Sequence, residues 1–257
     1  MAAGRRAGRL GWVVRHIARL PAREDRPWRS AEARRDPLRI LLAEMMLIRT
    51  KHKQAARVYA ELTRMSPEDL RDSGRLKDLL AGLGLRHRAD GILSALRYLG
   101  ERKGRVPDDP EELMRIPYVG RYITSAVLCF AFGKPVPPID SNIIRFTTRF
   151  FGLPAPHPSH PTRAHQSLWE SACRLAAVRR DPAAFFARLL DFCIDTCSPR
   201  PRCETCPLRA RCPYPTRRTS GGRPRRSGVR APGETPPRSG TSTTKRTPRT
   251  RSRPETT

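Results

Sequence analysis

The segment Ile116-Pro117-Tyr118-Val119-Gly120-Arg121-Tyr122 decides the fold of this chain, and Asp140 follows eighteen residues after its last tyrosine. A helix is predicted to lead into the segment, because the pair Asp109-Pro110 supplies an N-cap and a favourable first helical residue. The proline and the glycine of the segment then interrupt the helical pattern, and a strongly apolar helix resumes over 123–132. A glycine-containing turn before a helix N-terminus presents backbone N–H groups outward, so this hairpin is predicted to bind phosphate.

The charge of the chain indicates a polyanionic partner. Its 257 residues carry a formal net charge of +27, with a pI near 11.4. Codon bias in a G+C-rich genome explains why 45 of the 51 basic residues are Arg, but it does not explain the excess of positive charge. No stretch approaches the roughly 18 apolar residues of a membrane span, and residues 5–20 are too basic for a signal peptide. We therefore expect a cytoplasmic, nucleoid-associated protein with no membrane partner.

The last part of the chain has a different composition from the rest. Residues 214–257 contain twelve of the basic and two of the acidic residues, with almost no apolar side chains. Such a segment cannot bury enough apolar surface to offset its ordering entropy. We predict that residues 213–257 form a disordered basic tail. The other 39 basic and 22 acidic residues keep the folded part basic as well.

Helix starts recur with one signature, a capping residue followed by proline. The four pairs are Asp36-Pro37, Ser66-Pro67, Asp109-Pro110 and Asp181-Pro182. Between these pairs the apolar residues fall at helical spacing, and the best strand-like run, 136–139, is interrupted by prolines. The sequence therefore predicts an all-α protein of about ten helices with short connectors.

Four of the seven cysteines form the cluster Cys197-x5-Cys203-x2-Cys206-x5-Cys212. Closely spaced thiols in an Arg-rich loop favour a metal site over disulfides. Spacing alone leaves a structural zinc site and an iron–sulfur cluster equally open. Cys193, one helical turn earlier, is an alternative first ligand.

The hairpin and the aspartate after it resemble the helix-hairpin-helix of the endonuclease III-like DNA glycosylases, in which a Leu-Pro-Gly-Val-Gly hairpin precedes a catalytic aspartate. The resemblance covers residues 27–212 and is nearest to the thymine-mismatch and adenine glycosylase branch. It implies a two-domain all-α fold, in which 36–134 form a six-helix domain and 1–35 join 135–212 in an iron–sulfur domain. Tyr118 departs from the pattern, because it stands where the family has its first hairpin glycine. A non-glycine residue at that position is unfavourable if φ must be positive.

The resemblance also implies a cofactor. The cysteine cluster looks like the 4Fe–4S loop of the family, whose usual spacing is x6, x2, x5, so that Cys197 lies one residue closer than expected. We expect Cys197, Cys203, Cys206 and Cys212 to be the ligands, and the role of the cluster to be architectural. Arg209 and Arg211 lie in the same loop, where they are expected either to contact DNA phosphates or to be solvated.

Three residues are candidates for catalysis. Asp140 matches the catalytic aspartate of the resemblance, although local sequence alone reads it as a helix N-cap, and both roles are compatible. A carboxylate at this place would stabilise the oxocarbenium character that develops when an N-glycosidic bond breaks. Glu44 has apolar helical neighbours and is either a cleft residue with a raised pKa or an edge residue that reaches solvent. The resemblance makes it the residue that protonates the base or positions water.

Tyr122 occupies the position at which bifunctional members carry the Schiff-base lysine. Tyrosine cannot form an imine, so the enzyme is predicted to be a monofunctional glycosylase without lyase activity. The alternative is that Tyr122 is a packing residue in the first helical turn.

The resemblance also suggests DNA contacts. The hairpin residues Val119, Gly120 and Arg121 are expected to contact the backbone. Leu85 is a candidate for the wedge that fills the space of an extruded base, although a core leucine is an equal possibility. Arg49 belongs to an Arg-Thr pair that is closer to the thymine type than to the Gln-Gln of adenine glycosylases.

The expected substrate is duplex DNA with a mismatched or damaged base. Because of the Arg-Thr pair and because nothing foldable follows Cys212, the sequence favours excision of thymine or uracil opposite guanine by a monomer. Excision of adenine opposite guanine or 8-oxoguanine is the alternative. A DNA-binding module that has lost catalysis is a second alternative.

Overall fold

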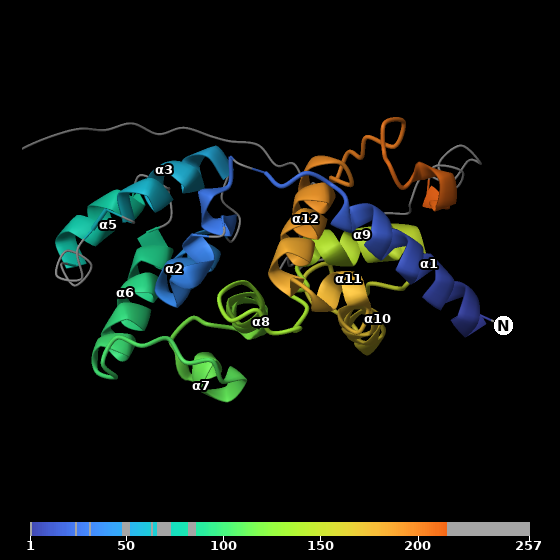
Figure 1. Ribbon diagram of the computed structural model, residues 1–257. Helices are drawn as coiled ribbons and strands as arrows, with labels where there is room; N and C mark the ends of the chain where they lie inside the picture. Colours follow the sequence, from blue (N-terminus) through green and yellow to red (C-terminus); the bar gives the residue numbers. More distant parts are fainter. Residues whose placement is uncertain are drawn as a thin grey trace, which may run out of the picture. The chain divides into compact units, whose positions relative to one another are not determined.

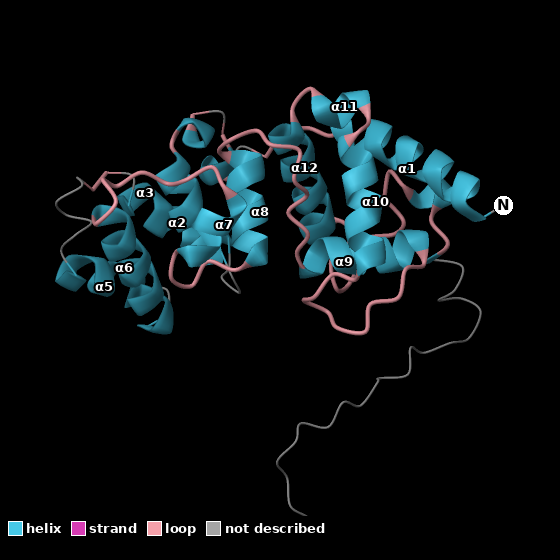
Figure 2. Cartoon of the chain, turned by 90° about the horizontal axis from the view of Figure 1, so that it is seen from below, coloured by secondary structure: helices cyan, strands magenta, loops and turns pink. Residues whose placement is uncertain are grey.

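The computed structural model describes residues 2–23, 25–30, 32–47, 52–62, 64–65, 73–81 and 86–214, and every regular element in these ranges is helical (Figure 2). The all-α prediction is therefore confirmed. The described residues all lie in the first of the chain's two compact units, residues 1–221. Within those ranges, no helix has the length and apolar character needed to cross a membrane.

The α-helices are α1 Ala2–Ala18, α2 Pro37–Leu47, α3 His52–Leu62, α5 Ser73–Ala81, α6 Arg86–Gly100, α7 Pro110–Arg115, α8 Arg121–Phe130, α9 Ser141–Phe151, α10 Arg163–Cys173, α11 Ala176–Arg179 and α12 Pro182–Asp195 (Figure 1). Short 3-10 turns are η1 Pro27–Arg29, η2 Ala33–Arg35 and η3 Arg209–Arg211. The segment 136–139 is a loop, as its prolines predicted.

The capping signature explains where three of these helices begin. Asp36 accepts hydrogen bonds from the first-turn amides of α2, Asp109 from those of α7, and Asp181 from an amide of α12. Each cap satisfies N–H groups that the helix itself leaves without partners, which is worth about 1 kcal/mol. The fourth pair, Ser66-Pro67, lies outside the described residues.

The helices pack in two neighbourhoods that meet at α8. α1 contacts α10, α11 and α12, whereas α2 contacts α3, α6 and α8. α12 also contacts α8 and α9, so the N-terminal helix lies among the C-terminal ones (Figure 1). This packing brings residues of the first fifty next to residues beyond 120, which is what assembles the site described below.

An aromatic cluster fills the core around α9. Trp169 of α10 is fully buried, and its indole N–H donates to the hydroxyl of Thr147, 3.0 Å away. That hydroxyl also donates to the carbonyl of Ile143, one turn earlier in α9. The aromatic rings packed against one another here are those of Phe146, Phe150, Phe151, Trp169, Phe186 and Phe192.

We expect Thr147→Val to destabilise the fold by about 1–3 kcal/mol, because it leaves the buried indole N–H of Trp169 without its acceptor. The thermal midpoint, followed by circular dichroism, should fall by about 2–4 °C for each kcal/mol lost. Thr124→Val is the matched control, since the hydroxyl of Thr124 is buried with no hydrogen-bond partner among the described residues. That variant should be neutral or more stable, and equal losses in both variants would contradict the hydrogen-bond argument.

Candidate active site and cysteine loop

The hairpin between α7 and α8 contains a strained residue. Tyr118 has φ 63°, in the left-handed region, which is unfavourable by about 1–2 kcal/mol for a residue with a side chain. The sequence raised the condition that a tyrosine at position 118 is unfavourable if φ must be positive, and φ is positive there. The side chains of Leu113, Ile116 and Val119 are buried and anchor the hairpin, whereas Tyr118 is 69% exposed.

The end of the hairpin forms the N-terminus of α8. Gly120 is the N-cap residue, and both Gly120 and Arg121 are exposed. The N–H of Val119 is donated to the carbonyl of Ile116, 3.1 Å away. Of the three predicted hairpin contacts, Gly120 and Arg121 therefore lie on the surface, whereas Val119 has a buried side chain and an occupied amide.

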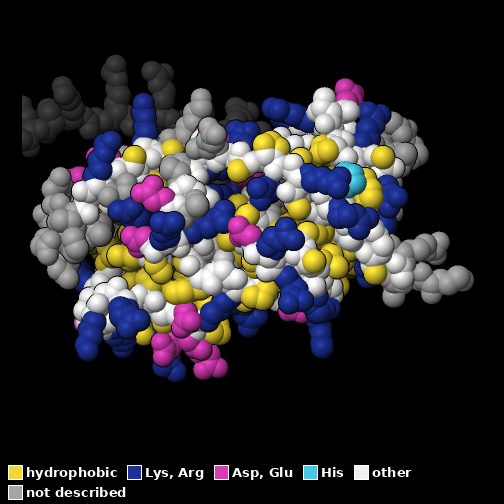
Figure 3. Space-filling view, in the orientation of Figure 1, with side chains coloured by type: hydrophobic (Ala, Val, Ile, Leu, Met, Phe, Trp, Pro, Cys, Tyr) yellow, Lys and Arg dark blue, Asp and Glu magenta, His cyan; other side chains and the backbone are white. Residues whose placement is uncertain are grey.

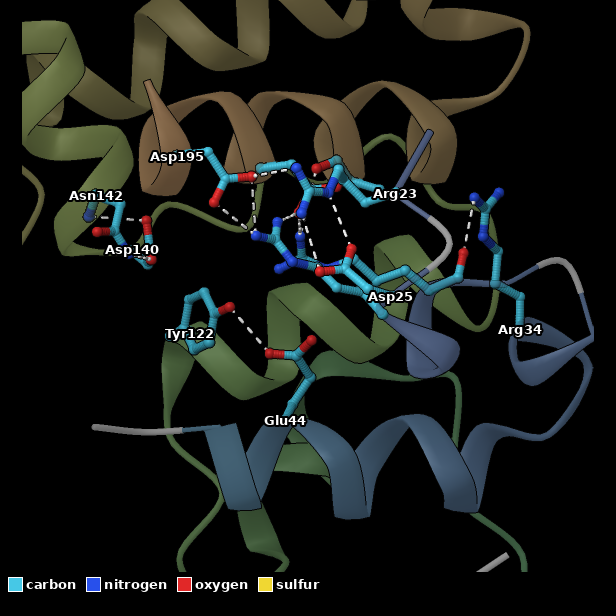
Figure 4. A network of polar contacts seen from close by, with 12 residues as sticks. Arg23, Asp25, Arg34, Glu44, Tyr122, Asp140, Asn142 and Asp195 are labelled. Carbon is cyan, nitrogen blue, oxygen red and sulfur yellow. Dashed lines mark hydrogen bonds and ion pairs between the residues drawn. The ribbon is translucent and has the colours of Figure 1, made fainter. Parts of the chain in front are cut away.

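Glu44 of α2 and Tyr122 of α8 are brought together across 78 residues of sequence. The phenol of Tyr122 donates to Oε2 of Glu44 at 2.9 Å (Figure 4). Glu44 is only 2% exposed, which excludes the edge position that reaches solvent. Burial raises the pKa of Glu44, while the charge of Arg29 and the hydrogen bond from Tyr122 act in the opposite direction. Burial also raises the pKa of Tyr122 well above its usual value.

Asp140 caps α9 and lies in the same region of Figure 4. Its carboxylate accepts hydrogen bonds from the backbone amides of Asn142 at 2.9 Å and Ile143 at 2.8 Å, and from the side-chain amide of Asn142 at 2.5 Å. Burial raises the pKa of Asp140, whereas these three donors lower it. The capping interpretation of the sequence is thus correct, and the same cap fixes the direction of the carboxylate beside Glu44 and Tyr122.

Arg29 is a further residue of this cleft, and sequence reasoning did not identify it. Its guanidinium pairs with the carboxylate of Asp191 from α12, and its positive charge lowers the pKa of Glu44, Tyr122 and Asp140 alike. The available signal was Asp191 itself, an acidic residue within the apolar sequence of α12, because a buried carboxylate requires a cation. Its partner lies 162 residues earlier in the chain.

Asp191 belongs to a larger buried ion-pair network. Arg26, which is 3% exposed, pairs with Asp191 and also with Asp195, 2.9 Å from its guanidinium. Arg23 extends the network at its exposed edge, 3.4 Å from Asp195 (Figure 4). The network joins the segment before α2 to α12, and Arg29 is held to α12 through Asp191.

A groove of about 680 Å³ lies beside Tyr122. Its walls include Gly120 and Arg121 from the hairpin, Ile139 next to the catalytic candidate, and His160 from the loop between α9 and α10. His160 is a second residue that sequence reasoning did not single out. The groove thus extends from the exposed hairpin surface to Tyr122, whereas Glu44 and Asp140 are not among its lining residues.

The four clustered cysteines line one pocket, together with aromatic residues of α9 and α12. Cys193 does not line it and is fully buried. Among the described residues, no three His, Cys, Asp or Glu side chains are gathered closely enough to hold a single metal ion. The pocket residues that surround Cys197, Cys203, Cys206 and Cys212 include Phe146, Phe150, Phe192 and Leu208.

Arg145 of α9 connects this loop to the catalytic turn. Its guanidinium donates to the carbonyls of Cys193 at 2.8 Å and Cys197 at 3.0 Å. It also donates to the side-chain oxygen of Asn142 at 3.0 Å, and Asn142 in turn donates to Asp140. A continuous chain of hydrogen bonds therefore runs from the start of the cysteine loop to the Asp140 carboxylate.

Arg149, one turn later in α9, holds the next part of the loop. It donates to the carbonyl of Cys197 at 3.1 Å and approaches its sulfur at 3.6 Å. It also bonds the carbonyls of Ser198 and Pro199, and it lies 4.6 Å from the ring of Tyr214. Tyr214 was assigned from the sequence to the tail, so the described chain continues past Cys212; residues 215–257 lie outside the described part.

The remaining predicted DNA contacts have different positions. Arg209 and Arg211 are exposed in η3, where Arg209 bonds the carbonyl of Glu204 and Arg211 lies over the ring of Trp12. Basic side chains are distributed widely over the face shown in Figure 3. Arg49 and Leu85 lie outside the described residues.

Comparison with known proteins places this geometry in a family. No protein-family model matches the chain. A thymine/uracil-DNA glycosylase of Pyrobaculum aerophilum is 36% identical over 197 residues, which cover 72% of this chain and 82% of the relative. An adenine DNA glycosylase of Mycobacterium tuberculosis is 30% identical over 207 residues, 77% of this chain and 64% of the relative.

The solved structure of a thermostable thymine-DNA glycosylase is similar to the fold, with a TM-score of 0.68 and 28% identity. The match covers 82% of this chain and 98% of that structure. The shared fold, the hairpin followed by Asp140 and the sequence identity lead to one conclusion. The chain belongs to the helix-hairpin-helix DNA glycosylase superfamily.

Proposed function

We propose that this glycosylase hydrolyses the N-glycosidic bond of thymine or uracil opposite guanine and leaves an abasic site. The observation that carries the proposal is the buried hydrogen bond between Tyr122 and Glu44 beside the capped carboxylate of Asp140. The Pyrobaculum aerophilum relative, named as a thymine/uracil-DNA glycosylase, supports the choice of base.

DNA is proposed to lie along the exposed hairpin. The N-terminus of α8 offers backbone N–H groups to a phosphate, and Arg121 adds a positive charge beside them. The target base must leave the stack to reach a buried acid, so the groove next to Tyr122 is proposed to take the extruded nucleotide. The partner is therefore duplex DNA with a mismatched or damaged base.

Asp140 is proposed to stabilise the sugar as the base departs. Breaking the bond develops positive charge at the sugar carbon, and a fixed carboxylate lowers the energy of that transition state electrostatically. The two backbone amides and Asn142 hold the Asp140 carboxylate in one orientation before the reaction begins. Little reorganisation is then needed when charge appears.

Glu44 is proposed to protonate the departing base or to orient the attacking water. Burial raises the pKa of Glu44, which favours proton transfer, and the positive charge of Arg29 acts against that rise. Tyr122 orients Glu44 through its phenol. Because a phenol cannot form the imine of a lyase reaction, the proposed enzyme releases the base without cutting the strand.

Adenine excision is the alternative substrate assignment. The Mycobacterium tuberculosis adenine glycosylase supports it, at 30% identity against 36% for the thymine/uracil relative. The Arg49-Thr50 pair in place of Gln-Gln favours the pyrimidine assignment. A DNA-binding module without catalysis is disfavoured, because Glu44, Tyr122 and Asp140 would then form a buried polar site with no use.

A 4Fe–4S cluster is proposed to occupy the cysteine pocket. A zinc ion would need all four sulfurs within about 2.3 Å of one point. A four-iron cluster takes one thiolate on each iron, and the four cysteines that line one pocket supply that number of thiolates. Cys193 is fully buried and does not line this pocket, which supports Cys197 as the first ligand. The cluster would fix the loop and would take no part in hydrolysis.

The remaining assignments follow from the family. We propose that residues 36–134 form the six-helix domain, that 1–35 and 135–212 form the iron–sulfur domain, and that 213–257 are a basic tail. The enzyme is proposed to act as a monomer at the nucleoid, where its +27 charge would favour non-specific DNA binding.

Asp140→Asn should lose base release by about a hundredfold to a thousandfold, because it removes the charge but leaves a residue that can still cap α9. Single-turnover release from a G·T duplex followed by alkali cleavage measures this, together with the Kd for the same duplex, which should change little. Asp109→Asn alters a cap of the same type away from the cleft and should leave the rate unchanged. Undiminished turnover of the Asp140 variant would remove this residue from the mechanism.

Glu44→Gln should abolish most base release and yet stabilise the protein, because it removes a buried charge and keeps an oxygen for Tyr122. The pKa of Glu44 in the fold is raised above its ordinary 4.5, so the wild type loses stability as pH rises from about 4.5 through the raised value. The gain in thermal midpoint, on the order of 2–4 °C, should be present at about pH 8 and absent below pH 4.5. A gain that is independent of pH would contradict this account.

Purified protein should be yellow-brown, with one four-iron cluster per chain by iron and sulfide analysis. Cys197→Ser should lose the visible absorption, whereas Cys193→Ser should keep it, since only the first lines the pocket. The reverse pattern would reassign the first ligand, and stoichiometric zinc without visible absorption would reject the cluster.

A further inference from the structure

Tyr118 has an unfavourable backbone conformation, and its side chain buries little surface. Its backbone lies in the left-handed region at φ 63°, where glycine is unstrained. Its side chain is 69% exposed, so the ring buries little apolar surface. The hairpin is held by Leu113, Ile116 and Val119 instead. Folding therefore does not explain the tyrosine.

A second locally unfavourable residue accompanies it. Gly91 lies inside α6, where glycine is a poor helix former. A Cβ at position 91 would approach Cγ of the Tyr118 ring at 3.0 Å and two further ring atoms at 3.2 and 3.3 Å. One face of the ring thus rests on the bare helix backbone, and the absence of a side chain at Gly91 sets the direction of the ring.

The location of the ring connects it to the proposed DNA surface. Tyr118 is two residues before Gly120, so their Cα atoms are at most about 7 Å apart. Arg121 is exposed directly beyond. The contact with Gly91 is in the second turn of α6. The exposed ring of Tyr118 therefore lies next to the hairpin residues that are proposed to contact DNA, with its position set by Gly91 of α6.

We infer that Tyr118 is a DNA-positioning residue, whose exposed ring packs on a deoxyribose of the strand held by the hairpin and whose hydroxyl donates to its phosphate. This inference rests on the proposed function for the location of the DNA. A ring contact is largely non-ionic, whereas Arg121 and the α8 N-terminus act through charge. Tyr118 thereby adds a contact with the DNA backbone at a position where a hairpin glycine would have no side chain.

The direct test is Tyr118→Gly, measured with a labelled duplex that carries a tetrahydrofuran abasic analogue opposite guanine, which the enzyme cannot hydrolyse. We expect Kd to rise about tenfold, while the slope of log Kd against log salt stays unchanged. Tyr118→Phe should lose about threefold, because only the hydroxyl is removed. Arg121→Ala should instead reduce the salt slope by about one.

Thermal stability of the variants shows whether a loss of affinity comes from misfolding. Tyr118→Gly relieves a positive φ, so its thermal midpoint should equal or exceed that of the wild type. Tyr118→Asn tolerates the same backbone and should show the same loss of affinity. If both variants keep the wild-type midpoint and the wild-type Kd, the inference is overturned.

Gly91→Ala tests the same idea without changing the tyrosine. The added methyl should displace the ring and raise Kd in the same direction as Tyr118→Gly. Gly100→Ala is the matched control in the same helix, since a Cβ there would meet no atom within 4 Å. Equal affinities of the two alanine variants would contradict a role for the ring direction.

Failure of the inference and failure of the proposed function have different signatures. If wild-type protein binds the duplex but releases no base from G·T, G·U or adenine mismatches, the proposed function fails while the Tyr118 measurements still decide the inference. If base release is normal and Tyr118→Gly binds as the wild type does, the function stands and the inference is wrong.

Discussion

The hydrogen bonds of Asp140 are the constraint on which the rest of the site depends. This carboxylate accepts two backbone amides and one side-chain amide, so that it begins α9 and is itself immobilised. Through Asn142 it is joined to Arg145, whose other bonds reach the carbonyls of Cys193 and Cys197. The cysteine loop and the cleft are therefore joined by one continuous chain of hydrogen bonds.

Desolvation and charge oppose each other throughout the cleft. Burial raises the pKa of Glu44 and of Asp140, and one cation, Arg29, lowers both. Arg29 can be buried there because Asp191 compensates its charge, and Arg26 shares that carboxylate. The cleft thus holds ionisable groups of both signs out of water, each stabilised by a partner from a distant part of the sequence.

Local features of this fold could be predicted from the sequence. The cap-and-proline pairs at Asp36, Asp109 and Asp181 specify helix starts through contacts within four residues, and all three are confirmed. Glu44 was recognisable because a carboxylate among apolar helical neighbours must either be buried or lie at an edge, and it is buried. The Asp140 cap was likewise a local pattern.

Contacts between distant residues could not be predicted in this way. The pairing of Arg29 with Asp191 spans 162 residues, and the bond from Arg145 to Cys197 spans 52. Nothing in the neighbourhood of either arginine distinguishes it from the many solvated arginines of this basic chain. Tertiary packing decides which arginines become part of the site. The helical spacing of apolar residues in the sequence carries no information about such distant pairs.

The contact between the Tyr118 ring and Gly91 has an evolutionary consequence. Each residue is locally unfavourable, and the ring occupies the space that a side chain at position 91 would fill. A relative with glycine in the hairpin would have room for alanine in the helix, whereas a relative with an aromatic residue in the hairpin would have to displace its ring. The residues at positions 91 and 118 should therefore covary among relatives. In a lineage that acquires both, the glycine at position 91 should appear before the tyrosine at position 118.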